Sequence, residues 1–76
     1  MKTVNILLNS INDVKNFVNL VNRFDFEIDL TSGRYTVDAK SIMGIFSLDL
    51  SKPIKVDVLS DNCDEFMKEI TPFLTD

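Results

Sequence analysis

The sequence has 76 residues, and its twelve acidic and eight basic side chains give a net charge of −4. This length suits one domain over residues 1–76, and the basic residues form no cluster that would bind nucleic acid directly. Histidine is absent and cysteine occurs once, at Cys63, so no imidazole-based catalytic site, metal site or internal disulfide is expected.

Two further features of the sequence limit the expected function. The N-terminal segment MKTVNILLNS is too short for a signal-peptide core or a membrane span. The two glycines, Gly33 and Gly44, stand apart and form no phosphate-binding loop. We therefore expect a cytoplasmic protein that has no cofactor, does not bind membranes and is not an enzyme.

Hydrophobic periodicity divides the chain into short strands and helices. Alternation predicts strands at residues 4–8, 26–31, 35–40 and 54–58, with a tight turn at 31–34. A helical period predicts a helix from residue 11 to 24 with Ser10 as its N-cap, and a short helix within residues 40–50. A last helix, capped by Asp61 or Asn62, should loosen near Pro72.

The predicted element order is βαββαβα. Each strand has one apolar and one polar face, which is typical of an antiparallel sheet that is covered on one side. We therefore predict an α+β fold, a two-layer open-faced sandwich in which three helices cover one face of a four-stranded antiparallel sheet. Open strand edges leave a monomer or a weak dimer possible.

The segment VDAKSIMGIFSL, residues 37–48, resembles the regulatory-serine segment of the HPr family. This family comprises the small phosphocarriers of the bacterial sugar phosphotransferase system, and the predicted element order agrees with its fold. The resemblance implies that Ser41 is phosphorylated by an HPr kinase/phosphorylase. It also implies partners among phosphotransferase-system proteins or a LacI-type catabolite control protein. Ser41 precedes the helix, where backbone N–H groups lack partners and a phosphate would find donors.

The short helix also predicts a docking surface. Helical geometry places Ile45 and Leu48 towards the sheet. Three other apolar side chains should then stay partly exposed around the serine: Ile42, Met43 and Phe46. We interpret these three residues as partner-binding contacts beside a switchable charge.

The sequence departs from the family pattern at the phosphocarrier site. Family members have a catalytic histidine at the start of the first helix, followed two residues later by an arginine and then a proline. Ungapped spacing from Ser41 places Ser10, Asn12 and Asp13 at these three positions. A serine phosphate ester transfers its phosphoryl group poorly, so Ser10 is interpreted as a helix cap. Asp49 replaces a glycine that is usual in the family, so a local difference in the turn is expected.

The leading hypothesis is a non-catalytic, HPr-like regulatory protein of the sugar phosphotransferase and carbon catabolite system, switched by phosphorylation of Ser41. In lacking the carrier histidine it resembles paralogues of the family such as the catabolite-repression HPr. One alternative is a constitutive protein-interaction module on the same scaffold, without phosphorylation. A second alternative is a divergent phosphocarrier that acts through another residue.

Overall fold

The computed structural model describes residues 2–75, and within them five strands form one sheet in the order β3-β2-β4-β1-β5. The strands are β1 (Lys2–Ile6), β2 (Ile28–Ser32), β3 (Tyr35–Asp38), β4 (Ile54–Val58) and β5 (Leu74–Thr75). The α-helices are α1 (Ile11–Val21), α2 (Ile42–Phe46) and α3 (Asp64–Glu69), and a 3-10 turn, η1 (Thr71–Phe73), follows α3. All strand pairs are antiparallel, which confirms the predicted α+β class.

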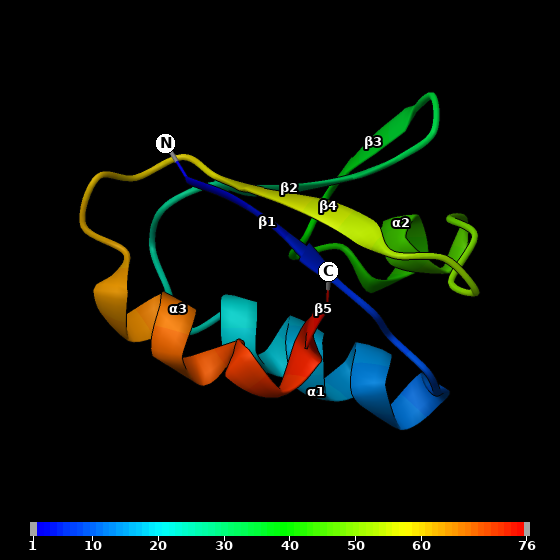
Figure 1. Cartoon of the computed structure of the whole chain (residues 1–76), viewed down its shortest axis with the longest axis horizontal. Coiled ribbons are helices and arrows are strands. Elements are labelled where there is room, and N and C mark those ends of the chain that lie inside the picture. The colour runs from blue at the N-terminus through cyan, green and yellow to red at the C-terminus, as the bar shows by residue number, and fades with distance from the viewer. Residues whose placement is uncertain (1, 76) are drawn as a thin grey trace.

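The fifth strand was not predicted. β5 pairs with β1 through Asn5↔Thr75 and Ile6↔Leu74. Pro72 explains the change from helix to strand, because proline cannot donate a helical hydrogen bond. The chain passes through η1 after α3, and the Phe73 carbonyl accepts a hydrogen bond from the Leu7 amide at 2.9 Å. The predicted loosening near Pro72 is therefore present, and it returns the chain to the sheet edge (Figure 1).

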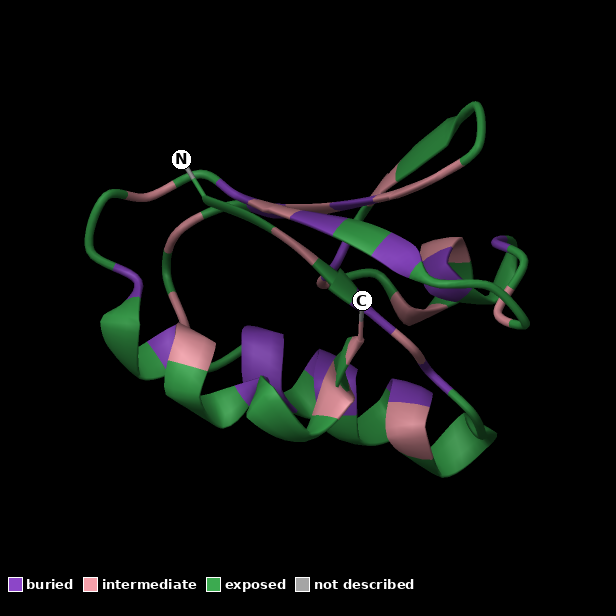
Figure 2. Cartoon of the chain, viewed as in Figure 1, coloured by how far each residue is buried: buried purple, intermediate pink, exposed green. Residues whose placement is uncertain are grey.

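The hydrophobic core lies between the sheet and the helices. In β4, Ile54, Val56 and Val58 are buried, while Lys55 and Asp57 point to the opposite face. Figure 2 shows the buried residues of α1 on its side nearer to the sheet, and these residues are Val14, Phe17, Val18, Leu20 and Val21. One apolar side per strand and one apolar stripe per helix thus produce the two layers.

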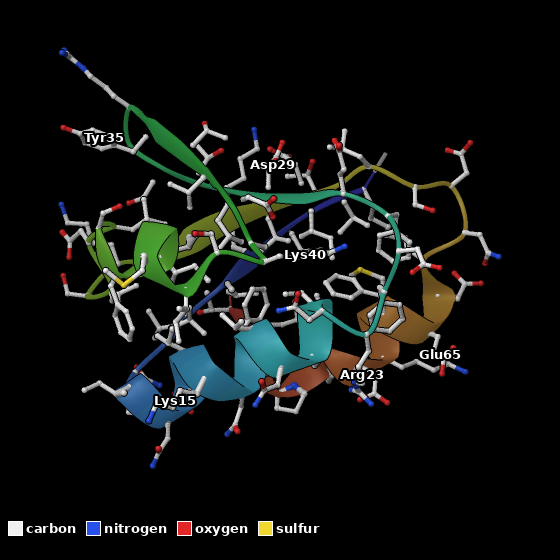
Figure 3. The ribbon with its side chains drawn as sticks, turned by 180° about the vertical axis from the view of Figure 1, so that it is seen from behind. Lys15, Arg23, Asp29, Tyr35, Lys40 and Glu65 are labelled. Carbon is white, nitrogen blue, oxygen red and sulfur yellow. The ribbon has the colours of Figure 1, made fainter. Side chains whose placement is uncertain are left out.

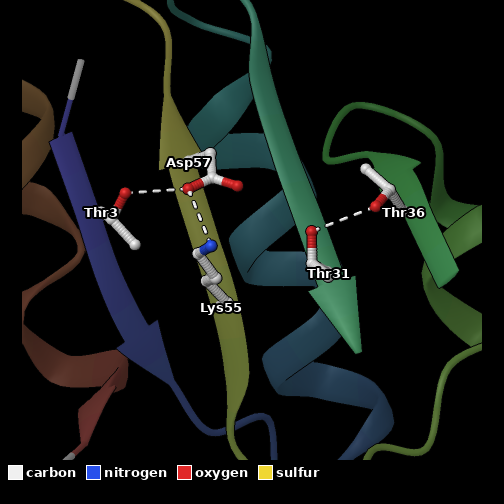
Figure 4. A network of polar contacts seen from close by, with 5 residues as sticks. All are labelled: Thr3, Thr31, Thr36, Lys55 and Asp57. Carbon is white, nitrogen blue, oxygen red and sulfur yellow. Dashed lines mark hydrogen bonds and ion pairs between the residues drawn. The ribbon is translucent and has the colours of Figure 1, made fainter. Parts of the chain in front are cut away.

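The face of the sheet that no helix covers is polar. The Thr3 hydroxyl donates to an Asp57 carboxylate oxygen at 2.8 Å, and the Lys55 ammonium lies 3.9 Å from the same oxygen (Figure 4). In the next row, the hydroxyls of Thr31 and Thr36 lie 3.2 Å apart. Thr3 and Asp57 are paired across β1 and β4, and Thr31 and Thr36 across β2 and β3, so these two contacts follow directly from the register. Lys55 and Asp57 are two residues apart on β4 and therefore share the same face of the sheet.

Several element boundaries differ from the sequence predictions. α1 ends at Val21 and not at residue 24, and β3 ends at Asp38 and not at residue 40, because the chain turns at Asp38. β1 ends at Ile6, where its pairing with β4 ends, and Leu8, which continues the alternation, is buried in the connection to α1. β2 begins at Ile28, and the preceding Phe26 instead packs edge-on against Phe66 of α3, with ring centroids 5.8 Å apart. The N-cap of α3 is Cys63, not Asp61 or Asn62; the Cys63 side chain is buried and makes no capping hydrogen bond.

Two further local expectations, the turn at Gly33 and the cap at Ser10, are confirmed. Gly33 has a φ of 61°, as the predicted tight turn between β2 and β3 requires. The Ser10 side chain caps α1. Within residues 2–75, no helix has the length and apolar character needed to cross a lipid bilayer.

Candidate functional site

Ser41 is the N-cap of α2 and is exposed to solvent. Its Oγ accepts a hydrogen bond from the Gly44 amide at 3.3 Å, and its carbonyl accepts one from the Ile45 amide at 3.1 Å. The hydroxyl oxygen of Ser41 therefore has a defined position at the N-terminus of α2, and the serine side chain is accessible to solvent. A group that transfers a phosphoryl to this oxygen would approach from solvent.

The segment before Ser41 fixes where α2 begins. The amide of the buried Ala39 donates to the Ile28 carbonyl at 2.9 Å, which extends the pairing between β3 and β2 by one bond. Asp38 then turns the chain, because its carboxylate accepts from the Lys40 amide at 2.8 Å and its carbonyl from the Ser41 amide at 3.0 Å. Figure 3 shows Lys40 in this connection, just before α2. The backbone position of Ser41 is thus fixed by its hydrogen bond to Asp38, the last residue of β3.

The apolar side chains of α2 divide into a buried and an exposed set, as helical geometry predicted. Ile45 is fully buried and Leu48 is 6% exposed. Met43 is 77% exposed and Phe46 is 41% exposed, while Ile42 is half-buried against the core. We call Ile42, Met43 and Phe46 the α2 patch. The placement of these side chains agrees with the expectation for a docking surface, and their function as partner contacts stays a prediction.

Ser10 occupies a similar position at the head of α1, but its surroundings differ. Its Oγ accepts from the Asp13 amide at 3.1 Å, and the Asp13 carboxylate accepts from the Asn9 amide at 3.0 Å. The helix N-terminus therefore already contains an anion from its own chain. The first turn of α2 contains no acidic residue. A carboxylate nevertheless lies near this serine too, because Asp38 accepts from the Lys40 amide at 2.8 Å just before Ser41. The two capping serines therefore differ in the origin of the nearby carboxylate, which comes from within α1 at Ser10 and from the segment before α2 at Ser41.

Sequence reasoning identified Ser10 and Asp13 separately but did not predict the bond from Asn9. The spacing of a serine and an acidic residue three positions later resembles a capping box, which would predict a bond from the Ser10 amide. The Asp13 carboxylate instead accepts from the Asn9 amide, one residue earlier. Ile11 was also missed as a surface residue. It is 62% exposed at the start of α1, which packs against α2. Its position before the buried stripe, which starts at Val14, is the signal that would have found it.

The loop after α2 is ordered by short-range hydrogen bonds. The Asp49 carboxylate accepts from the Ser51 hydroxyl at 2.5 Å and from the Ser51 amide at 3.1 Å. These two bonds, first the hydroxyl and then the amide, hold the pKa of Asp49 below its ordinary value of 3.8. No non-glycine residue among those described has a positive φ, so Asp49 is accommodated without strain.

The described residues do not form a metal centre. Within residues 2–75, no group of three or more potential metal ligands among His, Cys, Asp and Glu has the geometry to bind a metal ion. An open hollow of about 350 Å³ lies between the β2–β3 turn and the loop after α2, with Arg34, Tyr35, Ser47 and Lys52 among its lining residues. It adjoins the C-terminal end of α2 and not Ser41.

Comparisons with known proteins point to one family. The model described as "PTS HPr component phosphorylation site" matches residues 13–76. The chain is similar to HPr-C-His from Thermoanaerobacter tengcongensis, with a TM-score of 0.79 and 29% identity, covering 95% of this chain and 89% of that chain. It is also similar to the phosphocarrier protein HPr from Bacillus anthracis str. Ames, with a TM-score of 0.73 and 27% identity, covering 97% and 94%. No curated protein sequence matches at a comparable level of significance.

Proposed function

Since the chain belongs to the HPr family of the phosphotransferase system, we propose that it is a non-catalytic regulatory member, switched by phosphorylation of Ser41. The chain contains no histidine, so a histidine phosphocarrier mechanism is not available to it. The segment around Ser41 lies within residues 13–76, which the family model matches, and the proposal assigns the function to that segment.

One observation supports the proposal above the others. An exposed serine hydroxyl stands at the head of α2, and the apolar side chains of Met43 and Phe46 on the same short helix are exposed as well. Phosphorylation would add about −1.5 to −2 charges at neutral pH at this place. The added charge would lie beside an apolar surface, so a partner can recognise both features together.

The proposed partners are of two kinds. An HPr kinase/phosphorylase would add and remove the phosphate. The modified surface would then bind a LacI-type catabolite control protein or proteins of the phosphotransferase system. Phosphate oxygens form strong, bidentate hydrogen bonds with arginine, so the partner should present basic side chains near Ser41. The α2 patch would supply apolar area that is desolvated on binding.

A direct test uses the two capping serines as a matched pair. Wild type, Ser41→Ala and Ser10→Ala are incubated with an HPr kinase and ATP, and binding to the LacI-type protein is measured before and after. We expect phosphorylation to strengthen binding in the wild type and in Ser10→Ala, and to have no effect in Ser41→Ala. Equal binding of modified and unmodified wild-type protein would contradict the proposal.

A constitutive interaction module is the second candidate, because Met43 and Phe46 of the α2 patch are exposed in the unmodified protein. In that case Ser41→Ala would remove only a helix cap, and partner binding would not depend on ATP or kinase. The Ser41→Ala arm of the same experiment separates the two functions. If the protein is a phosphorylation switch, the wild type responds to the kinase and Ser41→Ala does not. If it is a constitutive module, neither protein responds.

The geometry at Ser10 argues against a divergent phosphocarrier. The family's arginine is absent from this turn, where Asn12 stands, and the Asp13 carboxylate adds negative charge next to Ser10. A serine phosphate ester also has an alkoxide leaving group, which makes transfer to the next protein slow. Phosphoenolpyruvate and the first enzyme of the phosphotransferase system should therefore leave no acid-labile phosphate on the protein.

A further inference from the structure

We propose that Gly44 is a positioning residue for the modification of Ser41, because it keeps one side of the Ser41 hydroxyl open to the phosphoryl donor. The inference rests on the proposed function and concerns the same site. Its evidence is independent of the exposure of Ser41, since it comes from the space around Gly44 and from the contact between α2 and β3.

The backbone does not require glycine at position 44. Among the described glycines, Gly33 has a positive φ and Gly44 does not, so any L-residue can adopt the backbone conformation found at Gly44. Alanine also has the higher intrinsic helix propensity. The reason for a glycine in the middle of this short helix must therefore be sought in its neighbours.

A side chain at position 44 would enter the space between β3 and the serine hydroxyl. A Cβ built on Gly44 would lie 3.2 Å from the Cβ of Val37 and 3.4 Å from the Oγ of Ser41. The first distance is shorter than most real contacts of this kind, so Val37 on β3 and the helix α2 would have to move apart by a few tenths of an ångström. The second distance places a methyl group in van der Waals contact with the oxygen that is to be phosphorylated.

Phosphorylation requires free space around this oxygen. Ser41 Oγ already accepts a hydrogen bond from the Gly44 amide at 3.3 Å, which occupies one direction of approach. In the reaction, Oγ forms a bond to the γ-phosphorus of ATP, the bond from that phosphorus to the bridging oxygen breaks, ADP leaves, and the hydroxyl proton passes to a base of the kinase. A methyl group at position 44 would crowd the oxygen on the Gly44 side and shift it with the helix.

The consequences of Gly44→Ala for stability and for phosphorylation therefore have different causes. The higher helix propensity of alanine should raise the unfolding free energy, and the tight contact with Val37 should lower it, so the two contributions oppose each other. Phosphorylation suffers from both the crowding and the shift, because small misplacements of a reacting group lower the rate strongly. Met43 and Phe46 lie on the same helix and would shift with it, but both side chains remain exposed. A displacement of a few tenths of an ångström affects a docking contact less than it affects a reacting oxygen, so KM should change less than kcat.

The test compares wild type, Gly44→Ala and Val37→Ala as substrates of an HPr kinase with ATP. Val37→Ala loosens the same contact between α2 and β3 without adding an atom beside the hydroxyl. We expect Gly44→Ala to lower kcat about tenfold, with KM changed by less than about twofold. Val37→Ala should lower the thermal midpoint and keep kcat close to that of the wild type.

Each outcome decides the proposal. Equal kcat for Gly44→Ala and wild type would overturn the role of Gly44 and leave the function of Ser41 intact. A loss of kcat in Val37→Ala as large as in Gly44→Ala would also overturn it, because packing alone would then explain the effect. If the wild type itself accepts no phosphate, the proposed function fails first and the role of Gly44 fails with it.

Discussion

Replacement of Met43 tests partner binding separately from folding, because the substitution should weaken binding and leave stability unchanged. It is 77% exposed, the highest value among the large apolar side chains that the structure describes. Replacing it by alanine removes little packing from the core, and exposed positions of this kind usually change stability by no more than about 0.5 kcal/mol. We therefore expect Met43→Ala to keep the wild-type fold and unfolding free energy.

The effect on binding follows from the same exposure. Complete burial of a methionine side chain contributes about 1.5–3 kcal/mol. Because 77% of Met43 is still accessible, a partner that covers it gains most of this amount. Loss of the side chain should then cost roughly 1–2 kcal/mol of binding free energy, which corresponds to a Kd that is about 5- to 30-fold weaker.

Isothermal titration calorimetry of the phosphorylated protein against the LacI-type control protein measures this change, and urea unfolding checks stability. Leu59→Ala is the matched control, because Leu59 is an exposed apolar residue outside α2, at 43% exposure. An unchanged Kd for Met43→Ala, or an equal loss for Leu59→Ala, would show that the α2 patch is not the docking surface.

Three further predictions concern stability. Ser10→Ala removes the cap of α1 and should lower the unfolding free energy by about 1 kcal/mol, seen as a lower thermal midpoint; an unchanged midpoint would contradict the cap. Asp29 is paired with both Asp38 and Asp57 in the sheet, and like charges at paired positions repel each other. Asp29→Asn should therefore raise the unfolding free energy by a few tenths of a kcal/mol, and this gain should become smaller at high salt. A gain that does not depend on salt would exclude charge repulsion as its cause. Because the pKa of Asp49 is lowered, its ionised form adds stability above pH 3.8, and this contribution disappears as the pH falls through the lowered pKa. The unfolding free energy of Asp49→Ala should therefore be lower than that of the wild type at neutral pH and equal to it in acid. A difference in unfolding free energy that persists in acid would refute this.

Most of the architecture was accessible from the sequence because the periodic signals were strong. Strict alternation in Ile54, Val56 and Val58 has one interpretation, a strand with one buried face, and the structure contains that strand as β4. Ser10 and Ser41 were recognisable as caps because each precedes an apolar helical pattern, and both side chains accept the expected backbone bond. The exposed α2 patch followed from helical geometry once α2 was placed.

The remaining features depend on tertiary contacts that local patterns do not encode. Phe26 continues an alternating run, yet it belongs to an aromatic cluster with Phe24 and Phe66 that closes one end of the sandwich. β5 has two residues, too few for a periodic signal, and exists because β1 offers a free edge. The N-cap of α3 is the buried Cys63, whereas cap rules favour the polar residues before it.

The most direct test of the central claim is to locate the phosphate. The protein is treated with an HPr kinase and ATP, digested, and analysed by tandem mass spectrometry. The account predicts one phosphate, on Ser41, and none on Ser10 or Ser47, which are also exposed. A protein that takes up no phosphate, or takes it up at another residue, would contradict the proposed switch.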